Sequence, residues 1–223
     1  MAGRIGMLFD LDGTLVDSVY QHVLAWHDAL RELGIELSVW RIHRKIGMSG
    51  GLFTQGLLRE TEQPLDEPRL THLQQLHAKH YAPHAGHVMP LPGAKALLRR
   101  LTELQTPWAI ATSGHIKSAG PTITALEVPD TVPVVTRDQV KRAKPDPDLF
   151  VAAAERLGVP IADCIVVGDS VWDLLAARRA RALSIGLLSG GYGREELERA
   201  GAYRVYQDPA DLLQHLDEVG IRA

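Results

Sequence analysis

FDLDGT, at residues 9–14, begins at the last residue of the apolar run Ile5–Phe9 and carries two aspartates directly after it. The run is predicted to be a buried strand, and side chains two residues apart on an extended chain point to the same side. Asp10 and Asp12 are therefore expected to converge at one end of a sheet. Like charges that close are costly unless a cation or a shared proton relieves them, and Mg²⁺ is the natural partner for carboxylates. An acidic turn ended by Gly13 explains the same residues as well.

Apolar runs of strand length recur along the chain and alternate with helix-like stretches. Further strands are expected at residues 108–111, 132–135, 164–167 and 182–187, and helices at Ala94–Leu104, Ile116–Leu126, Asp148–Leu157 and Trp172–Arg181. Continuous apolar runs suit strands that are buried on both faces of a parallel sheet. The alternation predicts a doubly wound, Rossmann-like α/β fold. Pro133 suits an edge strand or the start of a strand.

The interval from Ser18 to about Tyr81 contains only helical signals. Ser18, with Gln21 three residues later, is typical of a capping box. Helices are expected from Ser18 to a stop at Gly34, and then at Val39–Lys45, Leu52–Thr61 and Asp66–His80. The sequence therefore predicts an α/β core at residues 1–16 and 86–223 with an all-helical cap inserted at 17–85. Hinges are expected near Val16–Ser18 and Ala85–Pro92.

Composition restricts the class of protein. The 223 residues are 45% hydrophobic and 23% charged, which excludes wholesale disorder. The formal net charge of −3 argues against a dedicated nucleic-acid binder. A single cysteine, Cys164, fits a reducing compartment, and no apolar run approaches the roughly 18 residues of a membrane span. A cytoplasmic protein with no nucleic-acid or membrane partner is expected, either a monomer or a homodimer.

Three further polar segments follow predicted strands or stand in loops. Asp169 and Asp173, four residues apart, are expected to face the same way at a helix start, although N-terminal capping would explain one of them. Thr112-Ser113-Gly114 offers hydroxyl and backbone N–H groups for a phosphate, but small polar residues end many strands. Lys144, held between Ala143 and the prolines of KPDP, is either a rigid phosphate ligand or an ordinary loop lysine.

Together the four segments resemble the four motifs of the haloacid dehalogenase-like hydrolase superfamily. They are FDLDGTLVDS at 9–18, ATS at 111–113, KPDPD at 144–148 and GDSVWD at 168–173. The helical insert after the first motif resembles the cap of the phosphoglycolate phosphatase and β-phosphoglucomutase branch. The resemblance covers about residues 4–219.

The resemblance implies a role for each of these residues. Asp10 would be the nucleophile that forms an aspartyl-phosphate, and Asp12 would be the general acid and then the general base. Thr112, Ser113 and Gly114 would hold the phosphoryl oxygens, with Lys144 neutralising charge. Mg²⁺ would be the cofactor, bound by the Asp10 side chain, the Asp12 backbone carbonyl and Asp169. Asp173 would place its waters or orient Lys144.

The cap contains a basic cluster, Arg41, His43, Arg44 and Lys45, before the glycine-containing segment Gly47–Gly51. In the family this region holds a specificity loop, so Arg44 and Lys45 are expected to bind an anionic substrate. A solvated helix face is the alternative. His77, His80, His84 and His87 have spacings that could bind a transition metal from one helix face, but Pro83 and Gly86 would interrupt that helix, so ordinary surface histidines are favoured. Ser189–Gly193 is expected to be a flexible loop.

The sequence thus predicts a magnesium-dependent phosphomonoesterase acting on a small phosphorylated metabolite. Asp12 favours phosphoryl chemistry, because the dehalogenases of the superfamily lack an aspartate there. The alternatives are a phosphomutase of the β-phosphoglucomutase kind and a catalytically silent regulatory protein. The intact set of Asp10, Asp12, Lys144 and Asp169 disfavours the silent protein.

Overall fold

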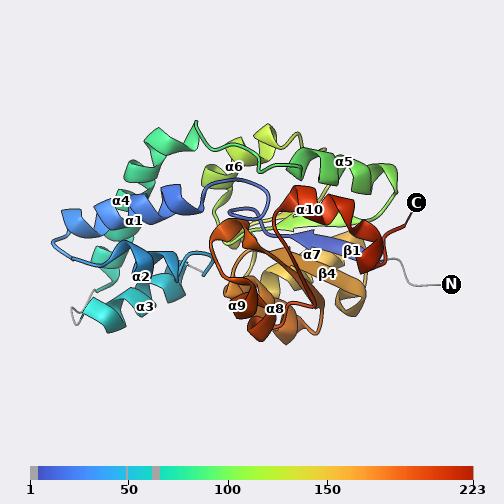
Figure 1. Ribbon diagram of the computed structural model, residues 1–223. Helices are drawn as coiled ribbons and strands as arrows, with labels where there is room; N and C mark the ends of the chain where they lie inside the picture. Colours follow the sequence, from blue (N-terminus) through green and yellow to red (C-terminus); the bar gives the residue numbers. More distant parts are fainter. Residues whose placement is uncertain (1–4, 49, 62–65, 223) are drawn as a thin grey trace.

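A parallel sheet of six strands lies at the centre of the computed structural model, which describes residues 5–48, 50–61 and 66–222 (Figure 1). The strand order is β3-β2-β1-β4-β5-β6, so β1 is central and is flanked by β2 and β4. The strands are β1 Gly6–Phe9, β2 Trp108–Ala111, β3 Val134–Val135, β4 Cys164–Gly168, β5 Leu183–Leu187 and β6 Arg204–Tyr206. This arrangement confirms the Rossmann-like prediction, and it brings the ends of β1 and β4 side by side, where doubly wound sheets bind ligands.

Two strands differ from the prediction. β3 is shorter than expected and begins after Pro133, because proline cannot donate to a ladder, and it lies at the edge of the sheet. β6 was not predicted, since its three residues are too few to show a periodic pattern.

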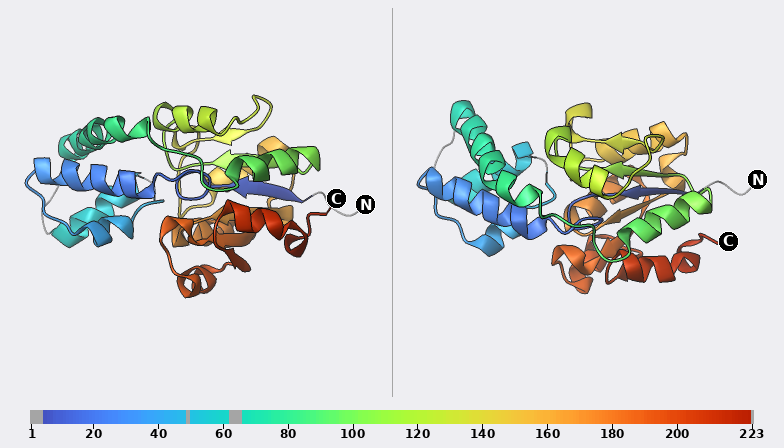
Figure 2. Two further views of the ribbon diagram at one scale, coloured as in Figure 1. Left: turned by 45° about the horizontal axis from the view of Figure 1, so that its top comes forward. Right: turned by 90° about the horizontal axis from the view of Figure 1, so that it is seen from above.

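Helices cover both faces of the sheet (Figure 2). The side chains of α5 (Ala94–Glu103), α6 (Ile116–Ala125) and α10 (Pro209–Gln214) pack on one face, and those of α7 (Asp148–Leu157) and α8 (Val171–Ala180) on the other. Helix α9 (Arg194–Ala200) packs beside α8 and β6. Among the described helices, none combines the length and the apolar character that a bilayer crossing requires.

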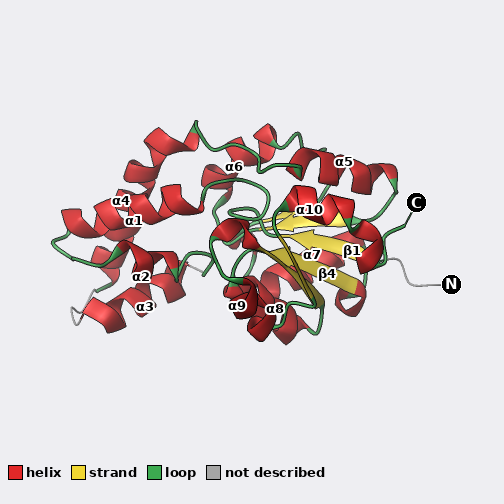
Figure 3. Ribbon diagram, in the orientation of Figure 1, coloured by secondary structure: helices red, strands yellow, loops and turns green. Residues whose placement is uncertain are grey.

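Four of the described helices form the cap, which stands beyond the end of the sheet toward which the strand arrows point (Figure 3). They are α1 (Val19–Glu32), α2 (Val39–His43), α3 (Gly50–Thr61) and α4 (Glu67–Ala85). The cap has its own apolar core, in which Val23, Leu30 and Leu73 are almost fully buried. Ser49, in the predicted glycine-containing segment, lies outside the described residues.

Two expectations about the cap helices are corrected. Helix α4 was expected to end at His80 but continues to Ala85, with Pro83 in its last turn, where the missing N–H of proline costs one helix hydrogen bond. Ser18 precedes α1 but makes no side-chain cap, because its hydroxyl donates to Asp12 Oδ1 instead, at 2.5 Å.

The two linkers between core and cap run next to each other. The backbone N–H of Asp17 donates to the Met89 carbonyl at 2.9 Å, and the N–H of Leu91 donates to the Leu15 carbonyl at 2.9 Å. Val16 and Pro90 form an antiparallel bridge between these bonds. The entry to the cap and the exit from it are therefore joined by backbone hydrogen bonds.

Candidate active site

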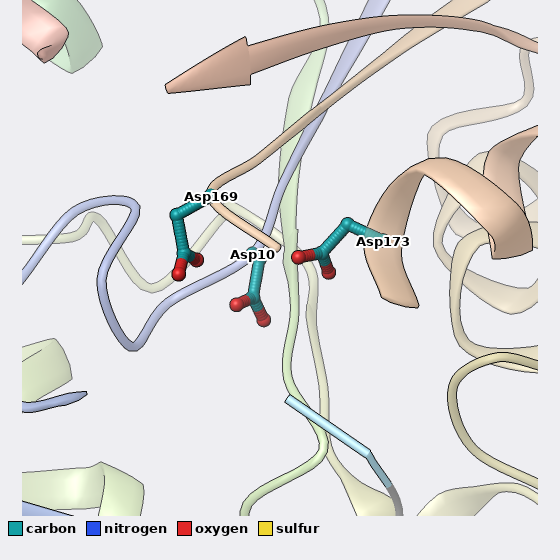
Figure 4. A group of neighbouring side chains, drawn as sticks. All are labelled: Asp10, Asp169 and Asp173. Carbon is teal, nitrogen blue, oxygen red and sulfur yellow. The ribbon is translucent and has the colours of Figure 1, made fainter. Parts of the chain in front are cut away.

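Three carboxylates converge at the ends of neighbouring elements (Figure 4). Asp10 follows β1, Asp169 follows β4, and Asp173 lies in the first turn of α8. One oxygen from each lies within 4.8 Å of the others, and all three side chains are buried. The pairing of Phe9 with Val167 contributes to this convergence, because it sets Asp10 level with Gly168, one residue before Asp169.

Lys144 supplies a positive charge to this cluster although its side chain is fully buried. Its ammonium forms an ion pair with Asp10 and lies 2.8 Å from Asp173 Oδ1. Burial lowers the pKa of Lys144, but the charges of Asp10 and Asp173 outweigh burial and raise it, so the lysine is protonated at neutral pH. The lysine therefore holds the nucleophile candidate in place and partly neutralises it.

The carboxylates carry more negative charge than one ammonium can balance. Burial, Asp173 and Asp12 raise the pKa of Asp10 to about 7 despite Lys144, and burial with Asp173 and Asp10 raises the pKa of Asp169 well above its usual value. Raised pKa values mean that the ionised cluster is unfavourable without a further cation. A hard divalent ion that takes carboxylate oxygens fits this set of residues, as Mg²⁺ does.

Two glycines, Gly13 and Gly190, leave room for the Asp169 carboxylate because they carry no side chain. Gly13 has a φ of +83°, and a Cβ there would meet Asp169 Oδ2 and a Val19 methyl group. A Cβ at Gly190 would overlap the same carboxylate. The segment that was read as a flexible loop therefore begins with a 3₁₀ turn, Leu188–Gly190, packed against the site, and Ser189 Oγ donates to the Gly13 carbonyl at 2.6 Å.

Asp12 lies apart from the three-carboxylate cluster and contacts the start of the cap. Its Oδ1 accepts a hydrogen bond from Ser18 and lies 3.4 Å from Nε2 of His22. Burial raises the pKa of Asp12, but the bonds from His22 and Ser18 outweigh it and lower the pKa. Sequence analysis missed His22 and the true role of Ser18. Their spacing of four residues, which places both on one helix face, was the available signal.

A cavity of about 570 Å³ opens above Asp10 and Asp12, between the cap and the core. Thr112, Ser113 and Gly114 line it, as their position after β2 predicted. Thr112 is buried and accepts a hydrogen bond from the Gly114 N–H at 2.9 Å, which fixes the turn. The cavity therefore brings the acidic groups and the hydroxyl-bearing loop together.

Arg44 and Lys45, the two cap residues expected to bind an anionic substrate, lie in different places. Lys45 lines the cavity, where its ammonium pairs with Glu60. The structure corrects the expectation for Arg44, which lies at the seam between cap and core instead of among the cavity residues. Its guanidinium pairs with Glu196 and lies 4.2 Å over the Tyr192 ring, while its carbonyl accepts hydrogen bonds from Tyr192 Oη and Trp172 Nε1.

Metal binding by the carboxylate cluster can be tested without an assay of activity. Mg²⁺ should raise the thermal unfolding midpoint by several degrees at about pH 8 and by less at about pH 5.5, because protons compete for Asp10 and Asp169. An Asp169→Asn variant should lose most of the shift, whereas Asp138→Asn, on the exposed rim, should retain it. An equal shift in both variants would contradict a site at Asp169.

Comparison with known proteins agrees with this geometry. The sequence model of the haloacid dehalogenase-like hydrolases matches residues 6–181. Hexitol phosphatase A of Escherichia coli is 35% identical over 179 residues, which cover 78% of this chain and 79% of that protein. A phosphoglycolate phosphatase of Rhodospirillum rubrum is 32% identical over 218 residues, covering 92% and 88%.

A solved structure also resembles the chain over nearly its whole length. A hydrolase from Pseudomonas syringae is 52% identical and superposes with a TM-score of 0.93, covering 96% of this chain and 98% of that one. The similarity includes both the sheet and the four-helix cap, since little of either chain is left unmatched.

Proposed function

The chain belongs to the haloacid dehalogenase-like hydrolases and is a phosphatase, and from this premise we propose that it is a magnesium-dependent phosphomonoesterase that forms an aspartyl-phosphate on Asp10. One observation carries the proposal. Asp10 is held by Lys144 beside two further carboxylates, and it shares one cavity with Asp12 and the Thr112 loop. We divide the chain into a core of residues 1–16 and 86–223 and a cap of 17–85, and place it in the cytoplasm.

Charge neutralisation and alignment are what phosphoryl transfer requires from a protein. Bound Mg²⁺, held by Asp10, Asp169 and the Asp12 carbonyl, would supply positive charge to the phosphoryl oxygens. Lys144 adds the charge of its ammonium beside Asp10 and is oriented by Asp173. The Thr112 hydroxyl and the Ser113 N–H bind the remaining phosphoryl oxygens, and Gly114 shapes the loop through its N–H bond to Thr112.

In the first half-reaction a carboxylate oxygen of Asp10 attacks phosphorus, and the bond from phosphorus to the ester oxygen breaks. Asp12 gives its proton to that oxygen. Its pKa is low in the free site, and the negative charge of an entering phosphate raises the pKa toward the protonated form. In the second half-reaction Asp12 takes a proton from water, which attacks the phosphorus and frees Asp10.

Phosphate release tests the proposal against the mutase alternative. The purified protein should release inorganic phosphate from some members of a panel of metabolite monoesters, and only when Mg²⁺ is present. Release equal to the alcohol formed supports the phosphatase. Rearrangement of a sugar phosphate without phosphate release would overturn it in favour of a mutase.

The Asp12→Asn variant distinguishes the general-acid role of Asp12 from the nucleophilic role of Asp10. Phosphorylation by an alkyl phosphate should slow by about 10²–10⁴-fold, because its leaving oxygen needs a proton, while an activated aryl phosphate should lose much less. Single-turnover mixing measures this step directly. Similar losses for both esters would refute the acid role of Asp12.

A further inference from the structure

Five rings of the cap form a continuous stack along one side of the cavity. The Trp26 ring centroid lies 4.3 Å from that of Phe53 and 4.0 Å from that of His77. His22 stacks on Tyr81 at 4.0 Å, with the ring planes 5° apart, and His77 lies beside both. All five line the cavity, and we call Phe53, Trp26, His77, Tyr81 and His22 the aromatic wall.

The aromatic wall begins at the general acid. His22 Nε2 lies 3.4 Å from Asp12 Oδ1, so the wall extends from Asp12 into the cavity. The ester oxygen that Asp12 protonates is the first atom of the leaving group. The rest of the leaving group therefore meets the wall as it extends away from the phosphorus.

The surfaces next to the wall are also apolar. Ile46 and Met48 contribute to the lining from the cap, and Pro121 does so from α6. Ala78 and Ala82, which follow His77 on α4, also line the cavity, and their small side chains occupy little of its volume. At about 570 Å³ the cavity is within the range of sites that hold a ligand with a ring system, and it is large for a two-carbon alcohol.

Polar groups of the lining mostly have partners within the protein. Lys45 pairs with Glu60, Ser113 donates to the Gly47 carbonyl, and His115 bonds Asp138. Nδ1 of His22 lies 3.2 Å from Nε2 of His77, within hydrogen-bond distance. Burial and the neighbouring His22 lower the pKa of His77 to about 3, so this ring is uncharged at neutral pH. The wall thus lines this side of the cavity with ring atoms, most of them apolar.

We propose that the leaving group carries an aromatic or heteroaromatic ring that stacks on the aromatic wall, so that the substrate class is the phosphate monoester of a ring-bearing alcohol. This inference rests on the proposed phosphatase function. A ring gains stacking and burial of apolar area at such a surface. A polyol placed against the wall would lose water from its hydroxyls, and the ring atoms there offer them few hydrogen-bond partners.

The first experiment compares esters that share the same kind of leaving oxygen. Benzyl phosphate and 2-phenylethyl phosphate are set against glycerol 3-phosphate and sorbitol 6-phosphate, all monoesters of primary alcohols. The ring-bearing pair should have kcat/KM values at least about tenfold higher, which corresponds to about 1.4 kcal/mol of binding. Equal or higher values for the polyol pair would overturn the inference and leave the phosphatase function intact.

Binding to the Asp10→Asn protein tests the inference without turnover. Titration calorimetry of the four esters in the presence of Mg²⁺ should give the same ranking. If the wild type hydrolyses none of them and the variant still prefers the ring-bearing esters, the failure lies with the phosphatase proposal, and the preference of the cavity for a ring-bearing ligand stands by itself. If the variant prefers the polyols, the inference fails.

A matched pair of variants locates the preference in the wall. Trp26→Leu keeps an apolar side chain but removes the ring, and should reduce the ratio of kcat/KM between benzyl and glycerol esters by about tenfold. Trp26→Phe keeps a ring and should retain most of the ratio. Thermal unfolding checks that both fold. An unchanged ratio in folded Trp26→Leu would overturn the assignment to the wall.

Discussion

Replacing Asp10 with asparagine is expected to lower kcat by several orders of magnitude while the protein stays folded. The amide keeps the size of the side chain but has no anionic oxygen to attack phosphorus, so no phosphoenzyme forms. Rapid quench with a labelled ester should show no covalent phosphate. Asp17→Asn, which removes an exposed carboxylate outside the cluster, is the matched control and should retain activity. Near-normal turnover in Asp10→Asn would overturn the aspartyl-phosphate mechanism.

The Asp10→Asn variant should also be more stable than the wild type at high pH. Asp10 has a folded pKa of about 7, above the 3.8 of an unperturbed aspartate, so the folded state binds the proton more tightly. Its ionisation therefore reduces the free energy of unfolding as pH rises from about 4 to 7. Without Mg²⁺, Asp10→Asn should melt roughly 5 °C higher than wild type at about pH 8, and the difference should shrink toward about pH 4. A variant that melts lower at both pH values would contradict this account.

Replacing Lys144 with methionine is expected to affect both catalysis and folding. The thioether matches the length of the buried stem but leaves Asp10 and Asp173 without their ammonium. Loss of one electrostatic contact to the reacting group should reduce the single-turnover rate by about 10²–10³-fold. Removing one partner of a buried ion pair should cost about 3 kcal/mol of unfolding free energy at about pH 8 without Mg²⁺.

Urea unfolding with and without Mg²⁺ measures the second effect of Lys144→Met. The cost should shrink at about pH 5.5, where Asp10, with its pKa raised to about 7, is protonated, and it should shrink again when Mg²⁺ is added. Lys95→Met breaks an exposed pair with Glu127 and serves as the control, with an expected change of less than about 1 kcal/mol. A cost that is the same at both pH values would mean that lost packing, not lost charge, explains it.

The sheet and its acidic motifs were predictable because they are local in sequence. A buried parallel strand is a continuous apolar run, and the residue after it stands at the carboxyl edge of the sheet, which sufficed for Asp10, Thr112 and Asp169. Lys144 was assigned by resemblance, and its loop gave no local sign that it would be fully buried. β6 was too short to be recognised.

Contacts between distant parts of the chain were not predictable in this way. Arg44 resembled a substrate ligand because its basic neighbours are visible in the sequence, while Glu196, its partner 152 residues away, is not. The contact of His22 with Asp12 depends on the turn at Gly13, whose left-handed backbone redirects the chain into the cap. The need for glycine at position 190 is likewise visible only in the structure, where the Asp169 carboxylate packs against it.

The paired linkers have a consequence for how such a molecule can change over generations. The linker that leaves the core and the linker that returns to it are hydrogen-bonded to each other, from the Asp17 N–H to the Met89 carbonyl. The cap is therefore inserted into the core as a loop is inserted between two paired strands. The entropic cost of closing such a loop rises only slowly as residues are added to it. A different set of helices, or a short turn, can be grafted at this junction without stretching a single strand. The cap residues that line the cavity can then be exchanged while the carboxylates of the core stay where they are.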